Sequence, residues 1–367
     1  MKNTYIQDWN RTKQRFTAWW QHEPIGHPLM RVIAEGKPAN GLADIEPFTS
    51  VEDMYFNVKK IVEHHRNGFK SLWYLEDSFP SVGLNLGAGS MALYLGTTPI
   101  FTPETVWFHE SITDWAAYPG IKFDPLNQWW VKHLQMIKEA QTLADGDFLV
   151  DIPDIVENMD ILSALRGPLE LCYDIVDEPE IIQKALDDIE GLYFTYYDAI
   201  YDIVKGADGS SSFTAFNVWG PGKTAKIQCD FNVLMSPDQF REIAVPRFTV
   251  QCQRLDNSIF HLDGPDAIKH VPALMEIEEL NALQWTCGAG QPDGGAEKWH
   301  PIYDQVKEAG KGLWIYLDDG NQKDCVEAAV RLIKRYGADL FYFNFLNHFP
   351  DKKSAEEAGE LIRKTSK

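Results

Sequence analysis

Short apolar runs alternate with longer segments of helical period along most of this chain. The apolar runs cover residues 69–76, 98–102, 147–152, 212–218, 258–263, 282–287, 312–318 and 340–346. Segments with helical period cover residues 126–145, 180–205, 237–256, 297–309 and 323–336. This alternation is typical of parallel strands joined by helices, and eight strand candidates favour an α/β (β/α)8 TIM barrel over an open sheet.

The length of 367 residues fits one barrel with insertions. We therefore expect a single domain over residues 1–367, with residues 1–67 as a helical and irregular N-terminal extension packed on the barrel. Ser236 and Pro237 predict the start of a helix, and Gly310 and Gly337 predict helix ends.

The charge and the hydrophobic pattern exclude several classes of partner. A formal net charge of −20 leaves no evident basic surface for nucleic acid or for an anionic membrane. The N-terminal stretch is polar, and no run of about 18 apolar residues occurs. The five cysteines are an odd number without CxxC spacing. These features predict a soluble protein of the reducing cytoplasm.

In a barrel, the active site gathers at the carboxyl ends of the strands, where the following loops converge. Polar, aromatic and metal-ligating residue types close the expected strands of this chain. They are Glu76, Asp77, Asp151, Asp154, Asn217, Trp219, His261, Asp263, Trp285, Cys287, Asp318, Asp319, Asn344, Asn347 and His348. Strand ends are often polar because they reach the surface, so it is the combination that indicates a site.

The segment IFHLDG at 259–264 is the most specific of these strand ends. The two-residue period of a strand puts His261 and Asp263 on one face and apolar neighbours on the other. The pair is either a satisfied buried polar pair or a site for metal binding or acid/base chemistry. Cys287 ends the next strand along the chain, so His261, Asp263 and Cys287 form a candidate zinc set.

Four segments resemble the uroporphyrinogen decarboxylase superfamily, which also contains methyltransferases that exchange methyl groups with corrinoid proteins. They are LSALRGPLELCYDIVDEPE at 162–180, LMSPDQFREIAVPRF at 234–248, FHLDG at 260–264 and GADLFYFNFLNHFPD at 337–351. The segment at 234–248 is the most specific. The resemblance covers roughly residues 25 to 365, and it implies the barrel fold more strongly than any one reaction.

The resemblance also assigns residues to a decarboxylase site. Arg31 resembles the first arginine of the decarboxylase motif, while Glu35 stands where the second one belongs. Asp77, Tyr173 and His348 resemble the family's strand-end aspartate, pocket tyrosine and late histidine. A porphyrinogen with many carboxylates needs cationic partners, and arginine is the usual one. The closing residues of the strands contain no arginine, so decarboxylation of uroporphyrinogen is the weaker expectation.

The methyltransferase branch implies a different site, in which a His-x-Cys strand end and a later cysteine hold zinc. Here the triplet is His261-Leu262-Asp263, and Asn344 stands in place of the later cysteine, so Cys287 or Cys229 would have to substitute. We expect zinc-dependent methyl transfer between a small molecule and a corrinoid carried by a partner protein. Substrate-binding residues would be Arg31, Tyr173, Trp219, Trp285, Tyr316 and Asn344, with Asp77 and His348 in catalytic or orienting roles.

Two alternatives stay open. One is a metal-independent decarboxylase of a tetrapyrrole or a smaller acid, in which Asp77 stabilises a cationic intermediate and Arg31 and His348 hold carboxylates. The other is a barrel that only binds a ligand or a corrinoid protein. A homodimer is a further expectation.

Overall fold

A seven-stranded, mainly parallel sheet is the centre of the computed structural model, which describes residues 1–2, 4–156 and 158–367. The strands lie in the order β2-β1-β13-β12-β11-β10-β9. Their bounds are β1 Leu29–Ala34, β2 Trp73–Glu76, β9 Thr224–Gln228, β10 Asn257–Asp263, β11 Ala282–Thr286, β12 Gly312–Leu317 and β13 Phe341–Phe345. Only the pairing of β1 with β2 is antiparallel. The expected α/β class with parallel strands is confirmed.

Six short strands lie outside this sheet. They form the parallel pair β3 Ser81–Val82 with β6 Leu149–Val150, and the antiparallel pairs β4 Thr98–Phe101 with β5 Val106–His109 and β7 Ser211–Phe213 with β8 Val218–Gly220. One parallel bridge, between Ile152 and Phe213, connects the β6 and β7 segments. Within the described residues the ladders do not close into one ring, so they show an α/β sheet and not a complete eight-stranded barrel.

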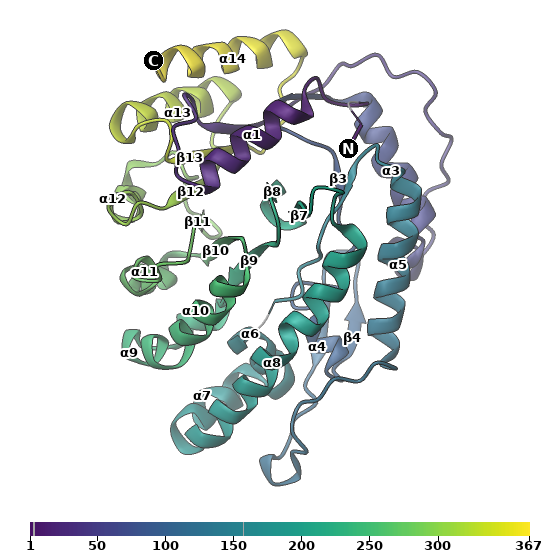
Figure 1. The fold of residues 1–367 in the computed structure, drawn as a ribbon, viewed down its shortest axis with the longest axis vertical. Helices are drawn as coiled ribbons and strands as arrows, with labels where there is room; N and C mark the ends of the chain where they lie inside the picture. Colours follow the sequence, from purple (N-terminus) through teal and green to yellow (C-terminus); the bar gives the residue numbers. More distant parts are fainter. Residues whose placement is uncertain (3, 157) are drawn as a thin grey trace.

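The helices cover the strands on their outer side. Their bounds are α1 Trp9–Trp20, α2 Val51–Phe56, α3 Val58–Ser71, α4 Met91–Tyr94, α5 Gln128–Ala144, α6 Asn158–Arg166, α7 Pro168–Asp177, α8 Pro179–Val204, α9 Pro237–Gln239, α10 Val245–Arg254, α11 Val271–Met275, α12 His300–Glu308, α13 Gln322–Tyr336 and α14 Lys352–Thr365. In Figure 1, α10, α11 and α12 lie along one side of β9–β12, and α3 and α5 lie together on the opposite side of the molecule, while α8 packs on α5 and also reaches α10 through Arg247. None of the helices in the described part of the chain is both long and apolar enough to span a bilayer.

The helices expected at 126–145, 180–205 and 323–336 are confirmed as α5, α8 and α13. The expected helix start is also confirmed, because Ser236 forms a capping box with Gln239 and Pro237 opens α9. Gly337 ends α13 with a φ of 89°, a conformation that glycine adopts at no steric cost.

Three strand predictions need correction. Residues 98–102 supply β4, one strand of a hairpin outside the sheet. Residues 147–152 supply the two-residue β6, which also lies outside the sheet, and residues 212–218 divide into β7, a short 3-10 turn and β8. The sequence reading missed β1 and β9. Since β1 lies inside residues 1–67, this segment contributes a strand to the sheet and is more than an extension packed upon it.

Helix α1 packs against the amino ends of the parallel strands. A Cβ at position 312, where β12 begins, would lie 2.6 Å from the Trp19 ring, so only glycine allows this approach. Trp19 Nε1 donates to the carbonyl of Leu340, just before β13. Trp9, Phe16, Trp19 and Trp20 are all buried, and an aromatic side chain of this size contributes about 2–3 kcal/mol on burial.

Candidate functional site

A cluster of polar side chains lies at the carboxyl ends of β9, β10 and β11. His261 on β10 pairs in register with Gln228 on β9 and Gln284 on β11. Register partners in parallel strands project to the same side of a sheet, so these three side chains share one face. Asp263 lies two residues after His261 and faces the same way, beside Thr286 at the end of β11.

His261 is held in one orientation by its neighbour on β11. Its Nδ1 bonds to Oε1 of Gln284, and Nε2 of that amide donates to Thr286 Oγ1 at 2.9 Å, which fixes the amide. Burial, followed by the nearby charge of Lys226, lowers the pKa of His261 to about 4. The imidazole is therefore neutral near pH 7, and with Nδ1–H directed at Gln284 the lone pair lies on Nε2.

Lys226 on β9 is the buried cation of the cluster, with 3% of its side chain exposed. Its Nζ donates to Oδ2 of Asp154 at 2.6 Å and also to Oε1 of Gln228. The Gln228 amide in turn donates to Oδ2 of Asp230 at 2.6 Å. A chain of hydrogen bonds thus runs from Asp154 through Lys226 and Gln228 to Asp230, and it holds each group in place.

Carboxylates outnumber cations in this cluster. Asp160 accepts the backbone N–H groups of Asp230 and Phe231, both at 2.9 Å. Desolvation and then the Asp160 charge raise the pKa of Asp230 well above its usual range, while Lys226 lowers it in part. Desolvation also raises the pKa of Asp160 and of Asp263. Three carboxylates, at positions 154, 160 and 230, thus share one ammonium group, and Asp263 adds further negative charge beside Asp230, which favours proton uptake at neutral pH.

A second polar group lies on β1 and β13. Arg31 Nη1 donates to Oδ1 of Asn344 at 3.2 Å, and Tyr316 is the register partner of Asn344 on β12. His348 Nδ1 lies 3.8 Å from a Glu35 carboxylate oxygen. Burial and the Arg31 charge lower the pKa of His348, and Glu35 opposes this shift. The structure thus brings together Arg31, Asn344, Tyr316 and His348.

Two predicted site residues lie at the amino ends of the strands. Asp77 is fully buried, and Arg15 of α1 donates to both of its carboxylate oxygens, at 2.6 and 3.2 Å. Because β2 runs antiparallel to β1, the residue that follows β2 lies beside Met30 near the start of β1. Trp219 packs on Trp9 of α1 with ring centroids 5.5 Å apart.

Three further predicted residues lie outside the cluster. Trp285 alternates with the inward-facing Gln284 and Thr286 and packs edge-on against Trp299 in the helix layer, with ring centroids 4.9 Å apart. Cys287 follows the end of β11, and its thiol bonds with Tyr316. Burial raises the pKa of Cys287 to about 12, which disfavours the thiolate that zinc binds. Tyr173 is 63% exposed on α7.

These placements do not assemble the expected zinc site. His261 and Asp263 share a face, but Cys287 follows the end of β11, and its thiol bonds with Tyr316. Catalytic zinc generally has three protein ligands. Across the described residues, Asp293, Asp318 and Asp319 are the only three potential ligands whose donor atoms all lie within 4.8 Å of one another. The residues present at His261 therefore do not fit zinc.

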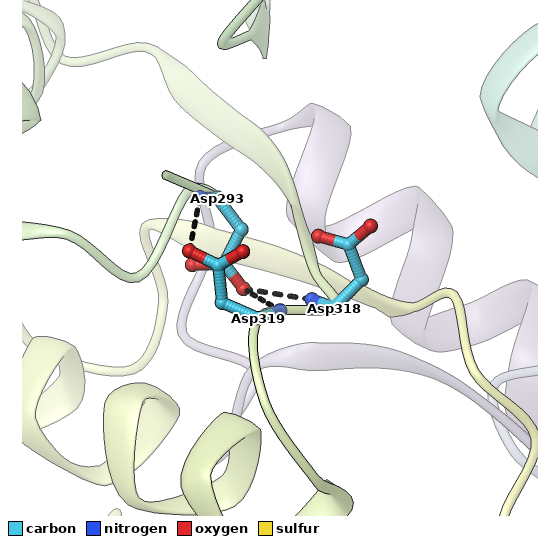
Figure 2. Close-up of side chains that lie close together, drawn as sticks. All are labelled: Asp293, Asp318 and Asp319. Carbon is cyan, nitrogen blue, oxygen red and sulfur yellow. Dashed lines mark hydrogen bonds between the residues drawn. The ribbon is translucent and has the colours of Figure 1, made fainter. Parts of the chain in front are cut away.

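The aspartate group 293, 318 and 319 joins two loops by hydrogen bonds to the backbone. Asp293 Oδ2 accepts the N–H groups of Asp318 and Asp319, at 2.7 and 2.9 Å, and its Oδ1 accepts that of Gly295 at 2.8 Å. Asp319 Oδ2 accepts the N–H of Asp293. Figure 2 shows the Asp318 carboxylate directed away from the other two. The hydrogen bonds of Asp293 and Asp319 to the loop backbone account for the position of these side chains without a bound ion.

Sequence reasoning missed Lys226, Gln228, Asp230, Asp160 and Gln284. A signal for two of them exists: in TAKIQ at 224–228, Lys226 and Gln228 alternate with Ala225 and Ile227. This is the same period of two that marked His261 and Asp263. No short-range signal connects Asp160 on α6 with Asp230, because they meet only in the folded chain.

Comparisons with known proteins give a likeness in fold but none in sequence. No protein-family model matches the chain, and no curated protein matches it in sequence. Among solved structures, the fold is similar to a methyltransferase from Methanosarcina mazei, with a TM-score of 0.61, 13% sequence identity and coverage of 96% of this chain and 98% of that one. At this identity the likeness shows a common fold along nearly the whole of both chains.

Proposed function

We propose that the chain is a methyltransferase with a (β/α)8 barrel of the uroporphyrinogen decarboxylase type. The observation that supports this most is the likeness in fold, over nearly the whole of both chains, to the Methanosarcina mazei methyltransferase. The place of the polar cluster adds support, because α/β barrels carry their chemistry at the carboxyl ends of the strands. In this chain Gln228, His261 and Asp263 lie at or near that end, and Lys226 lies two residues before the end of β9.

Methyl transfer needs a group that takes the proton of the acceptor. A thiol or alcohol acceptor gives an electron pair to the methyl carbon and loses its proton, while the donor atom keeps the electrons of its bond to carbon. Asp230 suits the proton-accepting role, because its raised pKa brings it toward neutral pH. His261 has its lone pair on Nε2 and suits the role of hydrogen-bond acceptor that orients the nucleophile.

A corrinoid carried by a partner protein would supply the methyl carrier. The cavity beside Asp230 opens at the surface, where Leu234 is 55% exposed, so a carrier has access to it. No step is assigned to zinc, since His261 and Asp263 lack the third ligand.

The test uses the intact protein with methylcobalamin and a panel of thiol and alcohol acceptors, followed by the absorbance change on demethylation. We expect turnover that falls about 100-fold or more in Asp230→Asn and in His261→Ala, the usual range for loss of a proton-transfer group. Asp202→Asn is the matched control, because Asp202 is a surface residue paired only with Lys205. Absence of turnover with every acceptor, or unchanged rates in both variants, contradicts the proposal.

Metal content is measured on the same preparations. We expect less than one equivalent of zinc per chain after incubation with excess zinc and desalting. One tightly held equivalent that disappears in His261→Ala would instead restore the zinc-dependent mechanism.

Decarboxylation is the second candidate, favoured by the contact of Arg31 with Asn344 near His348. This group suits one carboxylate and not the many of a porphyrinogen. Release of carbon dioxide from a small acid that depends on Arg31, without any methyl transfer, would reverse the order of the two candidates.

A further inference from the structure

A cavity of about 590 Å³ adjoins the polar cluster. Its walls come from β5 and the residues after it, from α6, and from the segment after β9. The residues that line it are Ala88, Gly89, Val106, Trp107, Phe108, Glu110, Val156, Asp160, Ser163, Ala164, Pro168, Gln228, Asp230, Phe231 and Leu234. A volume of this size suits a small organic ligand.

The charged residues that line the cavity are all acidic. Among the described residues they are Glu110, Asp160 and Asp230, and none of the described lining residues is a lysine, arginine or histidine. The neighbouring ammonium group, on Lys226, is held by Asp154 at 2.6 Å. The cavity therefore disfavours an anionic ligand and favours a cationic one.

Aromatic and apolar side chains form much of the rest of the lining. Trp107 and Phe108 on β5 lie on one wall, and Phe231 lies on another. Trp107 is 64% exposed, which is unusual for so large an apolar ring unless it serves a binding surface. Aromatic faces attract cations whose charge is spread over methyl groups, because these ions lose little hydration when they contact a ring.

The acidic side chains and the aromatic rings of the lining together restrict the class of ligand that the cavity can bind. A bare divalent cation needs several converging oxygen ligands, and no group of three potential ligands closer than 4.8 Å occurs here among the described residues. An apolar neutral molecule leaves the carboxylates of Asp160 and Asp230 without a counter-charge. A methylated ammonium group satisfies both parts of the lining, since its charge faces the carboxylates and its methyl groups contact the rings.

We infer that this cavity binds a small molecule with a methylated onium head group, such as a quaternary ammonium ion. The inference rests on the proposed function in that it names the substrate class of the same site. Binding itself needs no methyl carrier, so the two can be tested apart.

The experiment is calorimetric titration of the intact protein with choline and with its neutral carbon isostere, in which a quaternary carbon replaces the nitrogen. We expect saturable one-to-one binding of choline, and binding of the isostere that is weaker by about ten-fold or more. Equal binding of the two compounds, or no binding of choline, overturns the inference.

Two variants test whether choline binds in this cavity. Trp107→Leu and Glu110→Gln each change an exposed side chain, so folding is preserved, and we expect each to weaken choline binding by about three- to ten-fold. The control is Glu104→Gln, at the turn of the same hairpin but outside the lining, with unchanged binding. Unchanged affinity in both test variants would overturn the assignment to this cavity.

The outcomes separate this inference from the proposed function. Choline binding without methyl transfer to any acceptor supports the cavity assignment and contradicts the methyltransferase proposal. Methyl transfer from methylcobalamin to a thiol, with no choline binding, supports the methyltransferase proposal and contradicts the onium ligand.

Discussion

The two ends of the parallel strands differ in how their charges are matched. At the amino ends, the buried carboxylate of Asp77 accepts hydrogen bonds from both an arginine and a backbone N–H. At the carboxyl ends, Asp154, Asp160 and Asp230 share Lys226, and desolvation raises the pKa of Asp160, Asp230 and the neighbouring Asp263. The first arrangement stabilises the fold, whereas the second retains an excess of negative charge that a ligand or a proton can neutralise.

The largest expected effect comes from breaking the matched pair at the amino ends. Arg15→Ala leaves Asp77 buried without its counter-charge, so we expect the free energy of unfolding to fall by about 3–5 kcal/mol, measured by urea denaturation. Lys13→Ala is the control on the same helix. It removes a surface ion pair with Asp208 and should cost less than about 1 kcal/mol. Similar losses in both variants would show that burial of the pair is unimportant.

Neutralising a buried carboxyl group should change the free energy of unfolding by a smaller amount, and this amount should depend on pH. Asp151 follows β6, is almost fully buried, and burial raises its pKa to about 6. Its folded-state pKa is above the unfolded value of 3.8, so its contribution to stability is complete below about pH 4 and is lost as the pH rises through 6. Two pKa units correspond to about 3 kcal/mol as an upper bound.

We therefore expect Asp151→Asn to be more stabilising at pH 8 than at pH 4. The change that it causes in the free energy of unfolding should be about 2–3 kcal/mol more favourable at pH 8. The measurement is urea denaturation of both proteins at the two pH values. Asp145→Asn is the control, since the side chain of Asp145 is 82% exposed, and its effect should not vary with pH by more than about 0.5 kcal/mol. A pH-independent effect of Asp151→Asn would mean that Asp151 is ionised throughout this range.

The features that the sequence predicted correctly are those that depend on residues close together in the chain. Period-two alternation showed that His261 and Asp263 share a face, and helical period with capping residues located α5, α8 and α13. These signals are local. They depend on residues close together in the chain, and the structure agrees with them.

The errors concern relations between segments. Asp77 ends a strand, but the antiparallel direction of β2 puts it at the amino ends of the parallel strands. Cys287 follows the last residue of β11, and its thiol bonds with Tyr316 of β12 instead of joining His261 and Asp263. Strand direction and register are set by long-range pairing, which no local pattern in one sequence reveals. The hydrogen bonds from the backbone N–H groups of Asp230 and Phe231 to the Asp160 carboxylate also connect distant segments, so no local pattern predicts them.

The smallest expected effect tests whether the third acidic group, residues 293, 318 and 319, differs from the cluster at the carboxyl ends. Asp318 is half-buried, and its carboxylate points away from the other two, so Asp318→Asn should change the free energy of unfolding by less than about 0.5 kcal/mol. Asp293→Asn is the contrasting variant. Its amide would present an N–H₂ group to backbone donors that now bond a carboxylate, at a cost of about 2 kcal/mol.

If these aspartates only join two loops, millimolar Ca²⁺ or Mg²⁺ should leave the Tm of the wild-type protein within about 1 °C of its metal-free value, because an ion that does not bind the native state cannot stabilise it. Thermal unfolding followed by circular dichroism, with and without each ion, measures this. A rise of several degrees that Asp318→Asn abolishes would instead make the group a cation site. In that case the ion would bind one carboxylate oxygen from each of the three aspartates, which lie within 4.8 Å of one another.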